Sequence, residues 1–342
     1  MLEDILKFLT GRSGKSINKT QYRNLVFKGG GVRGIAYMGA LEVLEDEGIL
    51  RNIERVAGTS SGAIAATLVS FRQPVKDTLA LFDSLDLSKV PHNGMNGHEK
   101  GFRLLPLKNS DSYKRLFELY GWYSSDYFYD WLEDIIAGQC GGNRRATFKE
   151  FARRGFRDLH IIASNLSRRR AEDFSAETTP DVPVADAVRM SMSIPLFFEA
   201  LRFDGRQFGN GDFYVDGGLY NNYPIHLFDQ SRFAHNSRFF RGGVNWETLG
   251  LFLMPDDLDC DPKPEYPENI WEFLNLTIQS IYDSHQMSNI NQNLVDQQRT
   301  VMINDCGISS LQFDVKLGGE EYIRLYSSGR DSVFSFLKKE HK

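Results

Sequence analysis

Residues 25–34, Leu-Val-Phe-Lys-Gly-Gly-Gly-Val-Arg-Gly, decide the fold class of this 342-residue chain. A short apolar strand over 25–28 runs directly into a glycine-rich turn, and apolar residues at helical spacing follow from 35 to 47. The pattern then repeats, because a strand over 55–57 ends in the turn 58–62 and a helix of small residues covers 63–71. This order of strand, turn and helix predicts an α/β fold with a doubly wound, mostly parallel central sheet and flanking helices.

The rest of the chain extends this pattern. We expect further strands at 159–164, 214–216, 249–254 and 301–304, and helices over 112–137, 184–192, 270–298 and 320–339. An acidic loop covers 255–268. We interpret residues 1–22 as an N-terminal appendage and 23–340 as a single domain with a helical cap or lid inserted at about 85–145.

Composition narrows the class of protein. Apolar residues make up 41% and charged residues 25%, which is a globular rather than a disordered composition. The longest uncharged apolar stretch, Val56–Phe71, is 16 residues long and falls short of the roughly 18 that a transmembrane helix needs. The N-terminus lacks a basic flank before an apolar run, so we expect no secretory signal and a cytoplasmic protein, with non-classical export left open.

The spacing of the cysteines and the net charge argue against several other classes of protein. Cys140, Cys260 and Cys306 lie far apart without a CxxC pair, which argues against a disulfide framework or a zinc ribbon, and we expect neither metal nor cofactor. The formal net charge of −5 disfavours a dedicated nucleic-acid binder. That charge is uneven, because the segment Arg144–Arg170 carries +7 and the remainder −12.

The turn Gly58-Thr59-Ser60-Ser61-Gly62 fits the pattern Gly-x-Ser-x-Gly at a junction of strand and helix. At such a junction the glycines permit a crowded backbone, and the serine hydroxyl is presented at the sheet edge beside a helix N-terminus. Ser60 is therefore a candidate nucleophile, and the alternative is an ordinary Gly/Ser turn. For Ser61 we expect a hydrogen bond at the helix N-terminus.

The loop Gly29–Gly34 exposes successive backbone N–H groups, which is typical of a cradle for an oxyanion or a phosphate. Its spacing Gly-x-Gly-x-x-Gly also fits a dinucleotide fingerprint, which requires an acid about 20 residues on, at the carboxyl end of the second strand. Glu54 has the right count but precedes that strand, whose carboxyl end holds Ser60. The dinucleotide interpretation is therefore disfavoured.

A third motif, Asp216-Gly217-Gly218, follows the strand predicted over 214–216. An aspartate at a strand end is well placed to face a site along the same sheet edge as Ser60. The same dipeptide is also common in ordinary turns, so this motif carries little weight alone.

Together the three motifs resemble the patatin-like phospholipases. Lesser matches are Ser191–Pro195 followed by Phe197-Phe198, and Asn222-Tyr223-Pro224. The resemblance covers roughly residues 23–340 and implies a patatin-like three-layer architecture. It also implies a lipid acyl hydrolase of the phospholipase A or lysophospholipase type that acts without a catalytic histidine.

By the same resemblance, Ser60 is the nucleophile and Asp216 its base, in a dyad that works through an acyl-enzyme intermediate. The amides of Gly30, Gly31 and Val32 are the expected oxyanion donors, and Arg33 fixes the loop or neutralises a headgroup phosphate. The oxyanion loop as a whole comprises Gly29, Gly30, Gly31, Val32, Arg33 and Gly34. The supporting motif residues are Gly58, Gly62, Gly217 and Gly218.

Three alternatives stay open. The chain order Ser60, Asp216, His226 (or His235 or His285) fits an α/β-hydrolase-like esterase or acyltransferase with a Ser–Asp–His triad. Acyl transfer to an acceptor other than water uses the same residues as hydrolysis. A non-catalytic lipid-binding module is disfavoured, because neither the nucleophile nor the base is missing.

Two surface features bear on partners. The aromatic block Tyr113–Trp131 either packs a cap subdomain or forms an acyl-chain groove or interfacial anchor. The basic segment Arg144–Arg170 is either a solvated face or attracts anionic lipid. The expected partners are therefore a phospholipid or lysophospholipid substrate and, peripherally, the membrane surface. A protein activator or a homodimer stays open, and we expect no nucleic acid.

Overall fold

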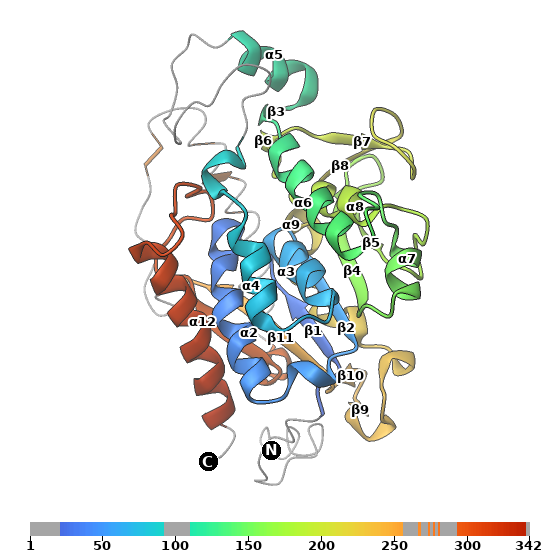
Figure 1. Cartoon of the computed structure of the whole chain (residues 1–342), viewed down its shortest axis with the longest axis vertical. Coiled ribbons are helices and arrows are strands. Elements are labelled where there is room, and N and C mark those ends of the chain that lie inside the picture. The colour runs from blue at the N-terminus through green and yellow to red at the C-terminus, as the bar shows by residue number, and fades with distance from the viewer. Residues whose placement is uncertain are drawn as a thin grey trace.

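The computed structural model describes residues 21–91, 110–255, 266–267, 273, 276–277, 280 and 293–339. At its centre lies an eight-stranded sheet, and in Figure 1 helices cover the face turned toward the viewer. The strands run in the order β12 (Thr300–Asn304), β11 (Thr248–Met254), β1 (Asn24–Phe27), β2 (Arg55–Thr59), β4 (Asp158–Asn165), β8 (Asp212–Asp216) and β7 (Leu201–Phe203), with β5 (Arg170–Phe174) also paired to β4.

The predicted mostly parallel sheet is confirmed. From β12 to β4 every neighbouring pair is parallel, whereas the pairs β4–β5, β4–β8 and β8–β7 are antiparallel. Because parallel strands all end at the same edge, the turns after β1 and β2 lie side by side there. The glycine loop and Ser60 therefore meet, as the repeated strand–turn–helix pattern predicts.

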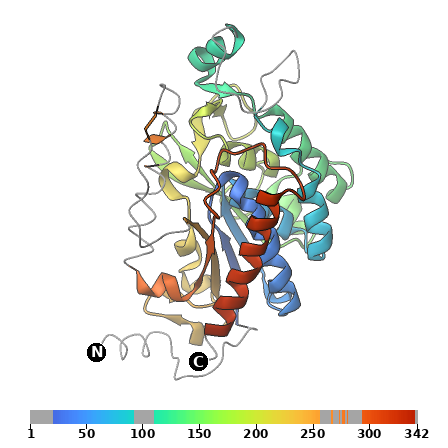
Figure 2. The same ribbon diagram turned by 90° about the vertical axis from the view of Figure 1, so that its left-hand side faces the viewer.

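Helices surround this sheet and the short strands beside it. They are α2 (Ile35–Asp46), α3 (Ser61–Ser70), α4 (Val75–Asp83), α5 (Ser110–Leu119), α6 (Asp126–Gln139), α7 (Phe148–Arg153), α8 (Val184–Ser191), α9 (Gly218–Asn221), α11 (Leu294–Gln298) and α12 (Glu320–Lys339). The short strands are β3 (Gly121–Tyr123) with β6 (Leu196–Phe198), and β9 (Phe240–Arg241) with β10 (Val244–Asn245). Figure 2 shows α12 lying lengthwise beside the sheet.

Strand β1 is buried on both faces, which explains its continuous apolar sequence. Leu25 and Phe27 belong to the main core under the helices, and Val26 belongs to a second cluster on the opposite face. That second cluster is covered by the segment 223–233 and contains Val26, Ala57, Ile225, Phe228 and Phe233. The sheet is therefore a middle layer, and its central strands bury apolar side chains on both sides.

The predicted helix over 270–298 is wrong at its C-terminal part. Helix α11 begins anew after Asn293, whose backbone is not helical (φ −107°, ψ 89°). The side-chain oxygen of Asn293 accepts the N–H groups of Val295 and Asp296, at 3.1 and 3.3 Å. Asparagine at such a position satisfies the first amides of a new helix, so it acts here as a start signal.

Several predictions concern residues whose structure is only partly described. The N-terminal appendage, most of the acidic loop 255–268, and His285 lie outside the described residues, and the cap expected at 85–145 is described only to 91 and from 110 onward. The domain boundaries stay predictions. In the part of the chain that the structure describes, no helix is both long and apolar enough to cross a membrane.

Candidate active site

Ser60 lies between the last residue of β2 and the first residue of α3, and its backbone has φ 55° and ψ −125°. A positive φ is strained for a residue with a side chain, and strain of this kind is typical of nucleophiles on strand-to-helix turns. The flanking glycines make room for the turn. A Cβ at Gly58 would lie 2.1 Å from the carbonyl oxygen of Gly62, and one at Gly62 would lie 2.5 Å from that of Phe27.

Asp216 reaches the same sheet edge from the opposite direction. Strand β8 is antiparallel to β4 and pairs with only the last three residues of that strand, so that Asp216 lies opposite Ala163. In β2, Thr59 lies opposite Ile162, one residue earlier in β4. The strand that carries Asp216 therefore ends just beyond the level at which β2 turns into Ser60.

The carboxyl group of Asp216 is buried, with 1% of the residue exposed. Its Oδ1 atom accepts the N–H of Gly218 at 2.7 Å, while Oδ2 is buried without a hydrogen bond of good geometry to any described residue. Burial raises the pKa of Asp216 to about 7, although the nearby Ser60 hydroxyl and the Gly218 N–H both favour its charged form. A carboxyl with this pKa can accept a proton near neutral pH.

Hydrogen bonds from the C-terminal end of α8 and the residues just after it fix the positions of Ser60 and Asp216. The Ser191 hydroxyl accepts the N–H of Ser60 at 2.9 Å and donates to the carbonyl oxygen of Ile162 at 2.5 Å. The backbone N–H of Asp216 donates to the carbonyl oxygen of Ser193 at 2.7 Å. Sequence analysis assigns no role to these serines. The sequence feature that could have identified these serines is the motif Ser-x-Ser before Pro195, whose alternating serines indicate buried hydrogen bonds.

The glycine loop packs directly on Ser60. A Cβ at Gly29 would lie 3.1 Å from the Cβ of Ser60, and the N–H of Gly29 donates to the carbonyl oxygen of Asn222 at 3.0 Å. Gly31 has φ +58°, and a Cβ there would lie 2.0 Å from the carbonyl oxygen of Ser310. Gly31 therefore requires glycine on both conformational and steric grounds.

The backbone N–H groups that are expected to bind the oxyanion differ in whether they already have a hydrogen-bond acceptor. The N–H of Gly30 donates to the Ser61 hydroxyl at 3.0 Å, and that of Val32 donates to the carbonyl oxygen of Ser310 at 3.0 Å. The N–H of Gly31 has no acceptor among the residues with described structure. Ser61 thus ties the glycine loop to α3 instead of capping its own helix as expected.

Arg33 and Gly34 complete the loop. The Arg33 side chain donates from Nε to the carbonyl oxygen of Gly30 at 3.1 Å and pairs with Asp305 at 2.7 Å. A Cβ at Gly34 would lie 3.1 Å from the Cβ of Ser61, so the loop also packs against the start of α3. Of the two expected roles of Arg33, its contacts match the one that fixes the loop.

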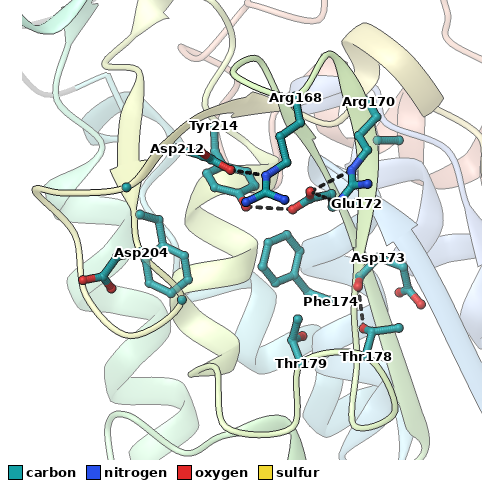
Figure 3. A pocket seen from close by; sticks show the side chains of 14 residues that line it. Arg168, Arg170, Glu172, Asp173, Phe174, Thr178, Thr179, Asp204, Asp212 and Tyr214 are labelled. Atoms are coloured by element: carbon teal, nitrogen blue, oxygen red, sulfur yellow. Dashed lines mark hydrogen bonds and ion pairs between the residues drawn. The ribbon is translucent and has the colours of Figure 1, made fainter.

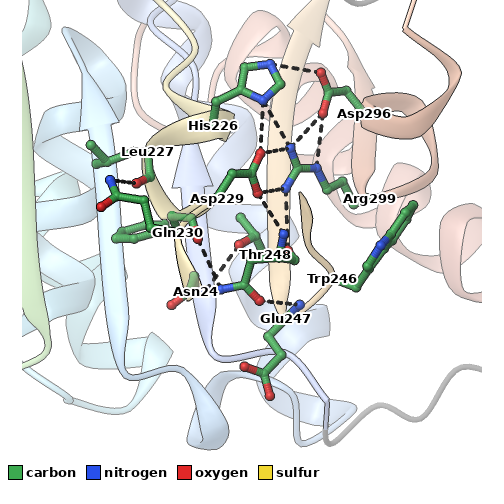
Figure 4. Close-up of polar contacts among 12 residues, drawn as sticks. Asn24, His226, Leu227, Asp229, Gln230, Trp246, Glu247, Thr248, Asp296 and Arg299 are labelled. Carbon is green, nitrogen blue, oxygen red and sulfur yellow. Dashed lines mark hydrogen bonds and ion pairs between the residues drawn. The ribbon is translucent and has the colours of Figure 1, made fainter. Parts of the chain in front are cut away.

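Asp216 has no histidine partner in the described ranges. His226 instead contacts Asp229 and Asp296, each at 3.0 Å, and these carboxylates raise its pKa to about 9. Both acids also pair with the buried Arg299, and Figure 4 shows this cluster. A histidine that is already protonated at neutral pH is unsuited to act as a general base.

The register of the sheet places this cluster away from Ser60. Arg299 precedes Thr300, which is level with Val26, whereas Ser60 is level with Gly29. Four residues along the strands and three strands across correspond to about 13 Å and about 14 Å. His235 contacts Glu54, just before β2, and His160 is buried between Asp158 and Asp173. None of these three imidazoles lies at the carboxyl edge of the sheet.

The basic segment Arg144–Arg170 is largely neutralised. Arg145 pairs with the buried Asp186 at 2.6 Å, and Arg157 is buried and donates to backbone carbonyls. The remaining pairs are Arg144 with Asp130, Glu133 and Asp134, Arg145 with Glu133, Lys149 with Asp181, Arg154 with Glu150, Arg168 with Asp212, and Arg170 with Glu172. The local charge of +7 is therefore not a free positive surface. Attraction of anionic lipid by the segment Arg144–Arg170 as a whole stays a prediction.

The aromatic block divides between core and surface. Phe128 and Trp131 of α6 are buried in the main core, whereas Phe117 and Tyr120 are exposed. Helix α6 therefore packs as a structural element, and the most exposed of the block's described aromatic side chains, Phe117 and Tyr120, precede β3.

An open pocket of about 680 Å³ lies elsewhere, between β5 and the loop after β7. Figure 3 shows that Arg168 and Arg170 at this pocket point toward Asp212 and Glu172, while Phe174 and Tyr214 line its wall. Neither Ser60 nor Asp216 lines it, so we do not assign it to the candidate site. Within the described structure, no three His, Cys, Asp or Glu side chains are grouped so that they could hold a metal ion.

Known proteins resemble this chain in sequence and in fold. A family model described as patatin-like phospholipase matches residues 25–229. YqhO of Bacillus subtilis, an uncharacterised protein, is 29% identical over 324 residues, which cover 93% of this chain and 99% of YqhO. A probable lipid hydrolase of Invertebrate iridescent virus 6 is 28% identical over 218 residues, 62% of this chain and 65% of that protein. The crystal structure of VipD from Legionella pneumophila shares the fold, with a TM-score of 0.58 at 16% identity over 94% of this chain and 67% of that chain.

Proposed function

Because this chain belongs to the patatin-like phospholipase family, we propose that it is a serine lipid acyl hydrolase of the phospholipase A or lysophospholipase type. The substrates are carboxylic esters of membrane lipids. One observation carries the proposal: a strained serine at a helix N-terminus lies beside a buried carboxyl group that keeps one oxygen without a hydrogen bond.

In the proposed reaction, the Ser60 hydroxyl attacks the ester carbonyl carbon and its proton passes to Oδ2 of Asp216. The tetrahedral intermediate collapses, the ester C–O bond breaks, and the departing alcohol takes the proton from Asp216. Water then attacks the acyl-enzyme and loses a proton to Asp216. The bond between the acyl group and the Ser60 oxygen breaks, Asp216 returns the proton to that oxygen, and the fatty acid leaves with the free enzyme restored. A carboxyl with a pKa of about 7 suits both directions of proton transfer.

The negative charge that develops on the carbonyl oxygen needs donors. Two features support this role: the N–H of Gly31, which has no acceptor among the described residues, and the N-terminus of α3, whose dipole places positive charge next to Ser60. In comparable sites, one such donor contributes about 2.7–4 kcal/mol of transition-state stabilisation. The Gly30 N–H can join them only if it gives up or shares its bond to Ser61.

A dyad without histidine is favoured over a triad. His226 is committed to two carboxylates and an arginine, and the register of the sheet separates this cluster from Ser60. Esters also have better leaving groups than amides, so a serine and one carboxylate suffice where peptidases use three groups.

The test is lipid profiling of the full chain with mixed phospholipid vesicles. Wild type should release free fatty acid, and Ser60→Ala should lower the rate by about 10³-fold or more. Ser61→Ala is the matched control: it removes one hydrogen bond and should keep the rate within about tenfold.

The products also separate the alternatives. Free fatty acid identifies hydrolysis, whereas acyl chains that appear on a second lipid identify transfer. If Ser61→Ala abolishes turnover and Ser60→Ala does not, the assignment of the nucleophile is wrong.

A further inference from the structure

Large apolar side chains are exposed together at one end of the molecule. Phe117 is 76% exposed, Leu119 45%, Tyr120 51% and Leu166 37%. Isolated exposed apolar residues are common on protein surfaces, but a contiguous group at one place marks an interaction site.

These residues come from three segments that contact one another. The ring of Tyr120 packs edge-on against that of the half-buried Phe213, with centroids 5.7 Å apart. The N–H of Leu166 donates to the carbonyl oxygen of Phe213 at 2.8 Å, and that of Ala200 donates to the carbonyl oxygen of Leu119 at 3.0 Å. We call the group formed by Phe117, Leu119, Tyr120, Leu166 and Phe213 the tip surface.

Basic side chains border the tip surface. The turn that follows Leu166 exposes Arg169, and the guanidinium of Arg202 lies over the ring of Phe213, 5.4 Å from its centroid. Neither arginine pairs with a carboxylate among the described residues, whereas Arg168 and Arg170 do. Glu118 is the opposing acid, exposed between two apolar members of the tip surface.

The tip surface lies on the side to which the candidate site faces. Phe213 precedes Asp216 by three residues in β8, which places it about 10 Å from Asp216 along the strand, beyond the carboxyl end of β4. Figures 1 and 2 show α5 at the end of the molecule opposite the last turns of α12. A surface that contacts the end of the molecule where α5 lies is therefore at the same edge of the sheet as Ser60.

We propose that the tip surface docks the protein on a lipid bilayer with anionic headgroups. Apolar and aromatic side chains enter the boundary between headgroups and acyl chains, while Arg169 and Arg202 attract the negative lipids. The choice of partner rests on the proposed lipid hydrolase function, but the docking itself needs no turnover.

The experiment is vesicle flotation with the full-length Ser60→Ala protein, so that the vesicles stay intact whatever the reaction is. Vesicles of phosphatidylcholine are compared with vesicles that also contain phosphatidylserine. On the latter, Phe117→Ser with Tyr120→Ser should lower the partition coefficient by about tenfold or more. The matched control is Leu317→Ser with Ile323→Ser, which changes apolar side chains of similar exposure. Leu317 lies just before α12 and is 62% exposed, and Ile323 lies in α12 and is 54% exposed.

Charge variants test the second half of the proposal. Arg169→Glu with Arg202→Glu should remove the preference for anionic vesicles, and Glu118→Lys should strengthen it about fivefold. The preference should also weaken as salt is added.

Two outcomes would overturn docking. One is that the tip and control variants float equally. The other is that wild type binds no vesicles while the tip variants change its oligomeric state in solution, which would make the tip an interface between protein copies. Turnover of a soluble short-chain ester, measured with Ser60 intact, reports on the proposed function separately. The tip variants should keep that turnover.

Discussion

Arg33 and Asp305 form an ion pair of 2.7 Å beside the glycine loop, although 272 positions separate them in the sequence. The same guanidinium holds the carbonyl oxygen of Gly30, so Asp305 fixes the loop through Arg33. The N–H of Val32 is bound to Ser310, five residues further on. The segment 305–310 thus positions the glycine loop, although it lies outside residues 25–229, which the family model matches.

Asp305→Asn should therefore lower kcat about tenfold and leave KM nearly unchanged, because the loop loses its charge pair while its substrate contacts persist. Steady-state kinetics with a soluble ester measures both constants. Glu42→Gln is the control, since Glu42 also pairs with an arginine, Arg330, but on the outer helices α2 and α12. Equal kcat values for Asp305→Asn and wild type would contradict a positioning role for Asp305.

The pH dependence of turnover should report Asp216. Burial raises its pKa to about 7, and only the carboxylate can accept the Ser60 proton. We expect kcat/KM to rise about tenfold per pH unit below about pH 7 and to level off above it. A rate profile from about pH 5 to about pH 9 checks this, with circular dichroism at each pH to confirm folding. A flat profile across pH 7 would argue against Asp216 as the base.

The raised pKa of Asp216 also predicts that its ionisation in the folded protein lowers the free energy of unfolding. Between the unfolded pKa near 3.8 and the folded value of about 7, the folded protein binds more protons than the unfolded chain, so stability falls as pH rises through this range. Asp216→Asn removes this cost. The variant should be inactive, yet about 1–3 kcal/mol more stable than wild type at pH 8 and nearly equal to it at pH 4. Denaturant unfolding at the two pH values measures the difference, and a variant destabilised at pH 8 would contradict it.

The His226 cluster should be structural. His226→Ala should keep kcat within about twofold, because this imidazole contacts Asp229 and Asp296 rather than Asp216. Arg299→Met should destabilise the protein by about 3–5 kcal/mol, since it leaves Asp229 and the buried Asp296 with only the exposed His226 as a charged partner. Ester turnover and thermal unfolding separate the two effects. A loss of turnover in a folded His226→Ala protein would revive the triad.

Sequence patterns predicted best what local residues encode. Each strand, its glycine turn and the helix that follows lie within one short stretch, residues 24–46 and 55–70, so local residues alone indicate the repeated unit. Strand β5 was not predicted, because three of its five residues, Arg170, Glu172 and Asp173, are charged, and its pairing with β4 alone makes it a strand. Asn293 was missed for a related reason: an asparagine fits a helix surface as well as a helix start.

The sequence by itself determined the strained turn at Ser60 and the glycine loop, because a tight turn depends on residues only a few positions apart. It did not determine how Asp216 reaches Ser60, since this depends on an antiparallel strand pairing only with the end of β4. Nor did it determine which loop amides are free, or that Asp305 holds Arg33. These are long-range contacts, and their partners exist only once the sheet has brought distant segments to one edge.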